Sequence, residues 1–234
     1  TFVGYGAGDA INTADYNTAV GANALSADTK GNRSVAVGMN ALLAQNFTSS
    51  TDAYNVAVGM SAGAAVTTGT QNTLIGGLAG DAITTASFST ALGYASLSAN
   101  TTGAYNVALG TYSLLSNTTA AQNTAIGYAA LYDNTTGASN VAVGYLALEN
   151  NTTASNNTAV GYASLSANTT GTNGSAFGLY ALKENTTGSY NVAMGRDALR
   201  NNTTASNNTA VGYNSLLANT TCTQNIAEGQ QSLN

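Results

Sequence analysis

A glycine recurs every 17 residues along almost the whole chain, and this period constrains the fold more than any other feature. Repeats of one fixed length predict a solenoid, in which each repeat contacts mainly its neighbours. We therefore expect residues 1–234 to form a single array of fourteen 17-residue rungs. One interval, from Gly38 to Gly59, is 21 residues long and places a four-residue insertion near residues 45–52. The anchor glycines are Gly4, Gly21, Gly38, Gly59, Gly76, Gly93, Gly110, Gly127, Gly144, Gly161, Gly178, Gly195, Gly212 and Gly229.

The residues within one rung predict β structure. Seventeen residues are too few for two packed helices, because helical repeats need about 33 residues or more. β-Branched residues alternate with small ones and are bounded by Gly and Asn, which is typical of short strands joined by turns. Proline is absent, as suits strands that hydrogen-bond on both edges. The predicted fold class is all-β, a parallel β-solenoid or β-roll.

The position relative to the anchor predicts which side chains point inward. Three residues before the anchor lies mostly Thr or Val, and one before it lies mostly Val, Ile, Leu, Met or Phe. Strand side chains alternate, so these two columns share a face. We expect them to form a narrow core with the leucine that follows most anchors by four residues.

The column between those two is alanine in twelve of fourteen rungs, and alternation then places it outside. A long apolar strip is rarely left in contact with water. We therefore predict that this alanine column, represented by Ala125, Ala142 and Ala159, is the seam of a homo-oligomer, most simply a trimer.

Other columns suggest surface contacts and ladders. Tyr128, Tyr145 and Tyr162 each follow an anchor directly, and Phe47 lies in the insertion. These four aromatic residues are the candidate contacts with a surface ligand, because exposed loops and repeated columns often carry binding. Asn-Thr-Thr triplets recur at the turns, and a further Asn precedes most strands. In-register stacking predicts that these asparagines form hydrogen-bonded amide ladders.

The charge content excludes several classes of partner. The net charge is −5, and charged residues make up only 6% of the chain. The basic residues form no stripe, so we expect no nucleic-acid partner. No apolar run approaches the roughly 20 residues of a membrane-spanning helix, so no membrane insertion is expected. Both ends of the chain fall within a repeat, which suggests a segment of a longer protein.

The sequence contains no pattern for catalysis. Histidine is absent, which removes the commonest general base and metal ligand. The acidic residues are scattered, and Asp197 beside Arg196 and Arg200 suggests a solvated ion cluster. We therefore predict that the chain is not an enzyme, with no catalytic residues, no cofactor and no metal site.

Two recurrent strings carry a resemblance to known fibres. They are Asn-Thr-Ala-Val-Gly-Tyr, as at residues 157–162, and Asn-Val-Ala-Val-Gly, as at residues 140–144. These strings resemble the head repeats of trimeric autotransporter adhesins of the YadA-like type, although the period here is longer. With the Asn-Thr-Thr-Gly turn, they are also similar to β-solenoid segments of phage tail fibres. Both resemblances imply a trimeric, surface-exposed fibre.

The function expected from this resemblance is that of a structural and adhesive shaft or head of a trimeric fibre. It would lie outside the cell, on a virion or a bacterial surface, and attach to a host or matrix surface. Its partners would be copies of itself, including end-to-end contacts, and a carbohydrate or matrix polymer. Two alternatives stay open: a self-assembling extracellular filament, and an ice-binding solenoid that uses threonine ladders.

Overall fold

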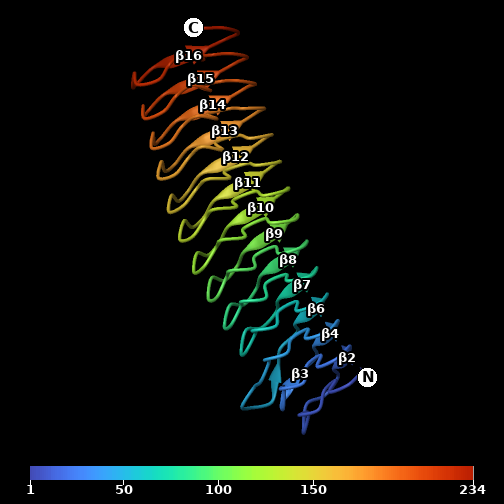
Figure 1. Cartoon of the computed structure of the whole chain (residues 1–234). Coiled ribbons are helices and arrows are strands. Elements are labelled where there is room, and N and C mark those ends of the chain that lie inside the picture. The colour runs from blue at the N-terminus through green and yellow to red at the C-terminus, as the bar shows by residue number, and fades with distance from the viewer. Residues whose placement is uncertain (234) are drawn as a thin grey trace. The chain divides into compact units, whose positions relative to one another are not determined.

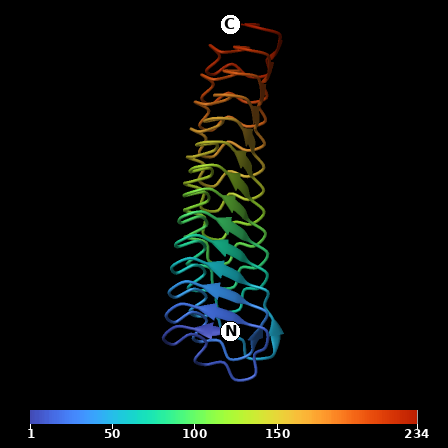
Figure 2. The ribbon, with the colours of Figure 1, turned by 90° about the vertical axis from the view of Figure 1, so that its right-hand side faces the viewer.

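The structure is a computed structural model that describes residues 1–233. The chain divides into two compact units, residues 1–121 and residues 122–234. Each unit is a parallel β-solenoid with the predicted 17-residue repeat, and the described residues contain no helix (Figures 1 and 2). The predicted all-β solenoid is therefore confirmed for each unit.

The first unit stacks short strands that pair in parallel with their neighbours. The register shifts by one repeat at each step, as in the pairing of Thr73 with Thr90. A second, two-stranded sheet joins β3 (Gly31–Asn32) to β5 (Thr51–Asp52) in the insertion. The main strands are β1 (Phe2–Val3), β2 (Thr18–Val20), β4 (Val35–Val37), β6 (Val56–Val58), β7 (Thr73–Ile75), β8 (Thr90–Leu92) and β9 (Val107–Leu109).

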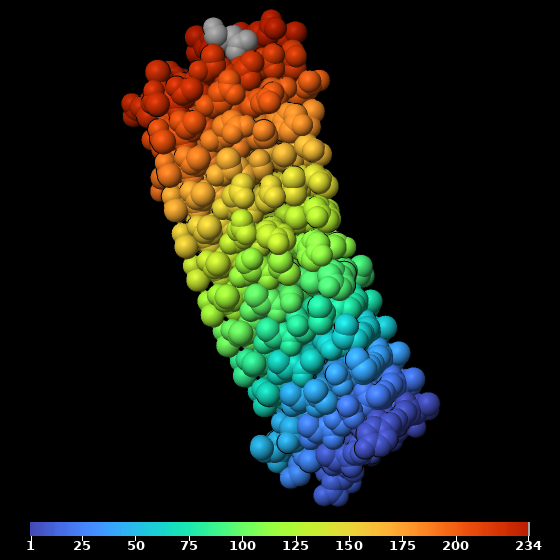
Figure 3. Space-filling model, viewed as in Figure 1, coloured from blue at the N-terminus to red at the C-terminus, as the bar shows by residue number. Residues whose placement is uncertain are grey.

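The second unit repeats this arrangement without an insertion. Its strands pair in parallel and in register, as Ala142 does with Ala159. The space-filling view shows the successive rungs of each unit packed directly on one another (Figure 3). The strands are β10 (Thr124–Ile126), β11 (Val141–Val143), β12 (Thr158–Val160), β13 (Ser175–Phe177), β14 (Val192–Met194), β15 (Thr209–Val211) and β16 (Ile226–Glu228).

The orientation predicted for the strand side chains is wrong. The alanine column points inward and is buried, as at Ala142 with 0% exposure, whereas the columns on either side of it face solvent. The leucine column is buried as predicted, for example at Leu148 and Leu165. The interior of one rung is too narrow for two opposed β-branched walls, because the leucine from the turn already fills it. Alanine is the side chain that fits beneath that leucine.

Where the alanine column carries a large residue, the leucine column carries glycine. Leu74 replaces alanine in β7, and its Cδ1 lies 2.7 Å from the point where a Cβ would stand on Gly63. Its Cδ2 lies 2.9 Å from the corresponding point on Gly80. Phe2 and Gly8 show the same exchange in the first rung. The interior therefore holds a nearly constant volume, to which the two columns contribute jointly.

Buried asparagines form the predicted ladder at the Asn-Thr-Thr turns. In the second unit, the Asn151 Nδ2 donates to Asn134 Oδ1 at 2.8 Å, and Asn168 Nδ2 donates to Asn151 Oδ1 at 2.9 Å. The asparagine column before the strands differs. Asn140 accepts from the backbone N–H of Asn157 and donates to the carbonyl of Ala154. Asn140 thus holds neighbouring rungs together through the backbone, whereas near the end of the column Asn225 Nδ2 donates to Asn208 Oδ1 at 3.0 Å.

The corners of each rung hold non-glycine residues with left-handed backbone. After Gly93 they are Ala95 (φ 50°), Leu97 (φ 56°) and Tyr105 (φ 60°). Such a conformation costs an L-residue roughly 1–2 kcal/mol. Each of these corner amides donates to a carbonyl of an adjacent rung, as Leu97 N does to Ser113 O at 3.0 Å. The corners are therefore stable only when neighbouring rungs are in place.

The paired exchange between columns can be tested by a double-mutant cycle. Leu74→Ala should lower the free energy of unfolding by about 2–5 kcal/mol, because it opens a cavity beside two glycines. Gly80→Leu alone should also destabilise, since its Cβ would stand 2.8 Å from Ile83 Cδ1 and 2.9 Å from Leu74 Cδ2, and only the second clash is relieved by Leu74→Ala. The double variant restores the usual alanine and leucine, so chemical denaturation should show it to be more stable than the two separate losses predict. If the loss of unfolding free energy in the double variant equalled the sum of the two single losses, the proposed compensation between Leu74 and Gly80 would be contradicted.

Candidate binding surface

The outward side chains of the strands form a surface that we call the strand face. It consists of the residues three and one before each anchor, such as Thr90 and Leu92 in β8. Leu92 is 49% exposed, and Met194 in β14 is 46% exposed. Thr90 is only partly covered. Each unit therefore presents rows of apolar side chains and threonines to solvent along its strands.

The predicted oligomer seam at the alanine column is wrong in its position. Ala125, Ala142 and Ala159 each have 0% exposure within the single chain. A side chain enclosed by its own rung cannot contact a second copy. The physical argument for a seam, an exposed apolar strip, applies instead to the strand face. The association of copies into a trimer stays a prediction.

The three candidate tyrosines lie on the surface of the second unit and stack on one another. The ring centroids of Tyr128 and Tyr145 are 5.2 Å apart, as are those of Tyr145 and Tyr162, with interplanar angles of 14° and 10°. Tyr180 meets Tyr162 edge-on. Both faces of the Tyr145 ring are thus occupied by neighbours. A ligand would meet its edge and hydroxyl, and a sugar ring could not stack on it.

The candidate contact at Phe47 is wrong, because this side chain is buried. It is 5% exposed, and its Cδ2 lies 2.7 Å from the point where a Cβ would stand on Gly31. The buried Asp28 accepts from Gly31 N at 2.9 Å and from Gln45 Nε2 at 2.8 Å. The insertion is therefore an ordered extension anchored by Phe47. The extra strand pair that holds it, β3 with β5, was not predicted, because no periodic pattern marks it in the sequence.

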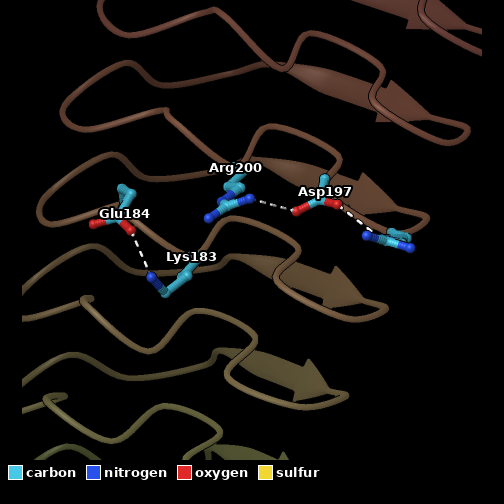
Figure 4. Close-up of polar contacts among 5 residues, drawn as sticks. Lys183, Glu184, Asp197 and Arg200 are labelled. Atoms are coloured by element: carbon cyan, nitrogen blue, oxygen red, sulfur yellow. Dashed lines mark hydrogen bonds and ion pairs between the residues drawn. The ribbon is translucent and has the colours of Figure 1, made fainter.

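Charged side chains gather on two successive rungs of the second unit. Arg196 Nε lies 3.0 Å from Asp197 Oδ2, and Arg200 Nη1 lies 3.1 Å from Asp197 Oδ1 (Figure 4). The Asp197 side chain is only 7% exposed. The expectation of a solvated ion cluster is therefore wrong for Asp197, although both guanidinium groups reach solvent. On the preceding rung, Lys183 pairs with Glu184 at 2.9 Å (Figure 4).

Two acidic side chains of the second unit interact unfavourably. Partial burial, and then the nearby charge of Asp133, raise the pKa of Glu149 above its ordinary value. The backbone N–H of Asp133 donates to the Glu149 carbonyl at 2.9 Å, which holds the two residues on adjacent rungs. This pair lies in no metal cluster: the described part of the chain contains no group of three or more His, Cys, Asp or Glu side chains placed to hold an ion.

Comparison of the chain with protein-family models, with curated proteins and with solved structures found no match. Within residues 1–233, no helical segment has the length and hydropathy of a membrane span.

The raised pKa of Glu149 predicts a pH-dependent effect on stability. The folded state binds the proton of this carboxyl more tightly than the unfolded state does, so its ionisation above the ordinary pKa opposes folding. Glu149→Gln should therefore raise the denaturation midpoint at pH 7. That gain should disappear below about pH 4, where the parent carboxyl is protonated in both states. Denaturation of both proteins at the two pH values measures the effect.

Glu184→Gln is the matched control, because the Glu184 carboxylate faces a lysine instead of an acid. It should give no stabilisation at pH 7. An equal gain for Glu149→Gln at both pH values would contradict the electrostatic origin of the effect.

Proposed function

We propose that this chain is a structural and adhesive segment of a trimeric fibre on the surface of a virion or bacterial cell. The observation that carries the proposal is the strand face, which exposes rows of apolar side chains along each unit. Monomeric soluble proteins rarely expose large contiguous apolar patches, and such patches usually mark an interface. The occupant that we propose for this face is the strand face of identical chains.

The regular repeat favours identical chains over an unrelated protein as the partner of the strand face. Outward residues one before the anchors recur at the same place on every rung, so two copies in register present matching rows. Closed rings of identical subunits are the usual form of soluble oligomers. Three copies would enclose their apolar rows and leave the turns, with their Asn and Thr side chains, facing solvent.

A fibre of this kind would have the properties needed for attachment. Its stiffness would come from backbone hydrogen bonds and buried amide ladders between neighbouring rungs. Repetition of one surface along three chains would raise avidity for a polymeric target. We propose a carbohydrate or matrix polymer as that target, met by the edges and hydroxyls of the tyrosine column and by the polar turns.

A second candidate, ice binding, is favoured by the outward position of threonines in the strand face. Thr90, Thr124 and Thr158 present partly exposed side chains from parallel strands. Against this function, the adjacent outward column varies between residues as different as Val160 and Phe177. A surface that matches a crystal lattice requires a regular array, so the fibre remains the better supported proposal.

The fibre proposal predicts a specific effect of charge on the strand face. Parent protein should have a mass near three times 23.3 kDa by light scattering. Val143→Lys with Val160→Lys should shift that mass toward 23.3 kDa, because the substitutions place charges in the apolar interface. Thr153→Lys with Thr170→Lys is the matched control, since both threonines are exposed at the turns of the same two rungs. This pair should remain trimeric.

A monomeric parent protein would contradict the trimer. If such a monomer also lowered the freezing point without lowering the melting point, ice binding would replace the fibre proposal. A mass that grows continuously with concentration would instead indicate an end-to-end filament.

A further inference from the structure

The cations of the second unit are concentrated at one place. Residues 122–234 contain three basic residues, Lys183, Arg196 and Arg200, and all three lie on the rungs that begin at Gly178 and Gly195. With Glu184 and Asp197, the cluster carries a net charge of +1, from three cations and two anions. The whole chain has a net charge of −5. The cluster is thus a local positive site on an otherwise acidic protein.

Asp197 holds the two arginines of this cluster. Its nearly buried carboxylate contacts one arginine with each oxygen, at 3.0 Å and 3.1 Å. Arg196 is bound through Nε, so its two terminal nitrogens remain for another partner, and its side chain is 61% exposed. A buried acid that accepts from two guanidinium groups fixes their direction and lowers the entropy lost when they bind a ligand.

Aromatic rings support the same cations. The Arg200 guanidinium carbon lies 5.0 Å from the centroid of Tyr180, and the Lys183 ammonium lies 5.4 Å from it. The Arg196 guanidinium carbon lies 5.7 Å from the centroid of Tyr213. Cation–π contacts of this kind hold a charged group beside a ring while leaving its edge available. Each of the three cations is therefore held in place and still reaches solvent.

We propose that this cluster binds an oxyanion group, a carboxylate or a sulfate, of an acidic polysaccharide. A guanidinium group can donate two parallel hydrogen bonds to two oxygens of a carboxylate or of a sulfate. Glu184 and Asp197 leave only one net positive charge, which suits single anionic groups spaced along a chain. Arg196 directly follows its anchor and the other cations lie further along the turn, so the cluster stays open when the strand face is covered. The inference rests on the proposed attachment function and names its ligand class.

The test measures binding of the intact protein to alginate, dextran sulfate and neutral dextran by calorimetry. We expect binding to one or both acidic polymers and none to neutral dextran. Alginate alone would identify the carboxylate as the ligand, and dextran sulfate alone would identify the sulfate. Binding to neither acidic polymer, or equal binding to neutral dextran, would overturn the proposal. The trimer mass is measured separately, so a fibre that binds no acidic polymer would leave the fibre proposal intact.

Substitutions locate the site. Arg196→Gln, Asp197→Asn and Arg200→Gln together remove the cluster without leaving a buried unpaired charge, and change the net charge from −5 to −6. Arg33→Gln makes the same change in net charge at an arginine that also contacts an aspartate and two tyrosines. The triple variant should weaken binding by about tenfold or more, and Arg33→Gln should leave it unchanged. Equal losses would show diffuse attraction and overturn the site.

Asp197→Asn distinguishes binding at an organised site from non-specific electrostatic attraction to the polymer. This substitution raises the net charge by one, so non-specific attraction would make binding to acidic polymers tighter. An organised site should bind more weakly, because the two guanidinium groups lose the carboxylate that directs them. An unchanged unfolding midpoint confirms that the variant is folded, and tighter binding by the folded variant would overturn the role of Asp197.

Discussion

The architecture depends on how closely the backbones of successive rungs approach at the anchor glycines. Gly178 has φ +134°, and a Cβ there would lie 2.6 Å from the carbonyl oxygen of Gly195. No other residue tolerates both that conformation and that contact. The close approach brings the strands into register, so that Gly195 N donates to Phe177 O at 2.8 Å. Within each rung, the alanine of the strand and the leucine of the turn occupy a narrow interior, as at Ala142 and Leu148 with 0% exposure, and this interior determines which side chains can point inward.

The period alone was enough to predict the solenoid, the short strands, the turn positions and the amide ladder. It could not predict the orientation of the strands, because alternation shows which side chains share a face and not which face is inside. Two signals in the sequence could have decided this. The alanine column is nearly uniform, as a confined space requires, whereas the column beside it varies and ends in Glu228. A charged residue in that column is explained by its outward position in β16.

The burial of two side chains, Phe47 and Asp197, depends on contacts that cannot be predicted from the repeat period. Phe47 was expected at the surface because insertions usually are, yet β3 and β5 pair and enclose it. Asp197 was expected in water because its neighbours are arginines. Its left-handed backbone (φ 57°) places it at a corner, where the nearly buried carboxylate contacts one guanidinium group with each oxygen. In contrast, the exchange between Leu74 and Gly80 is visible in the sequence once the two columns are known to share one interior.

The narrow interior also explains why the larger apolar side chains of the strands lie on the outer surface. Because the interior of a typical rung is already filled by alanines, one leucine and two asparagines, the larger β-branched and aliphatic residues of the strands must lie outside. The single chain therefore leaves larger apolar side chains of its strands partly exposed, as at Leu92 and Met194, and association of strand faces would bury them. If association covers the strand face as proposed, the turns would stay exposed and available for recognition. A charge cluster supported by Tyr180 and Tyr213 at such a turn can contact a polymer without disturbing either the interior or the proposed interface.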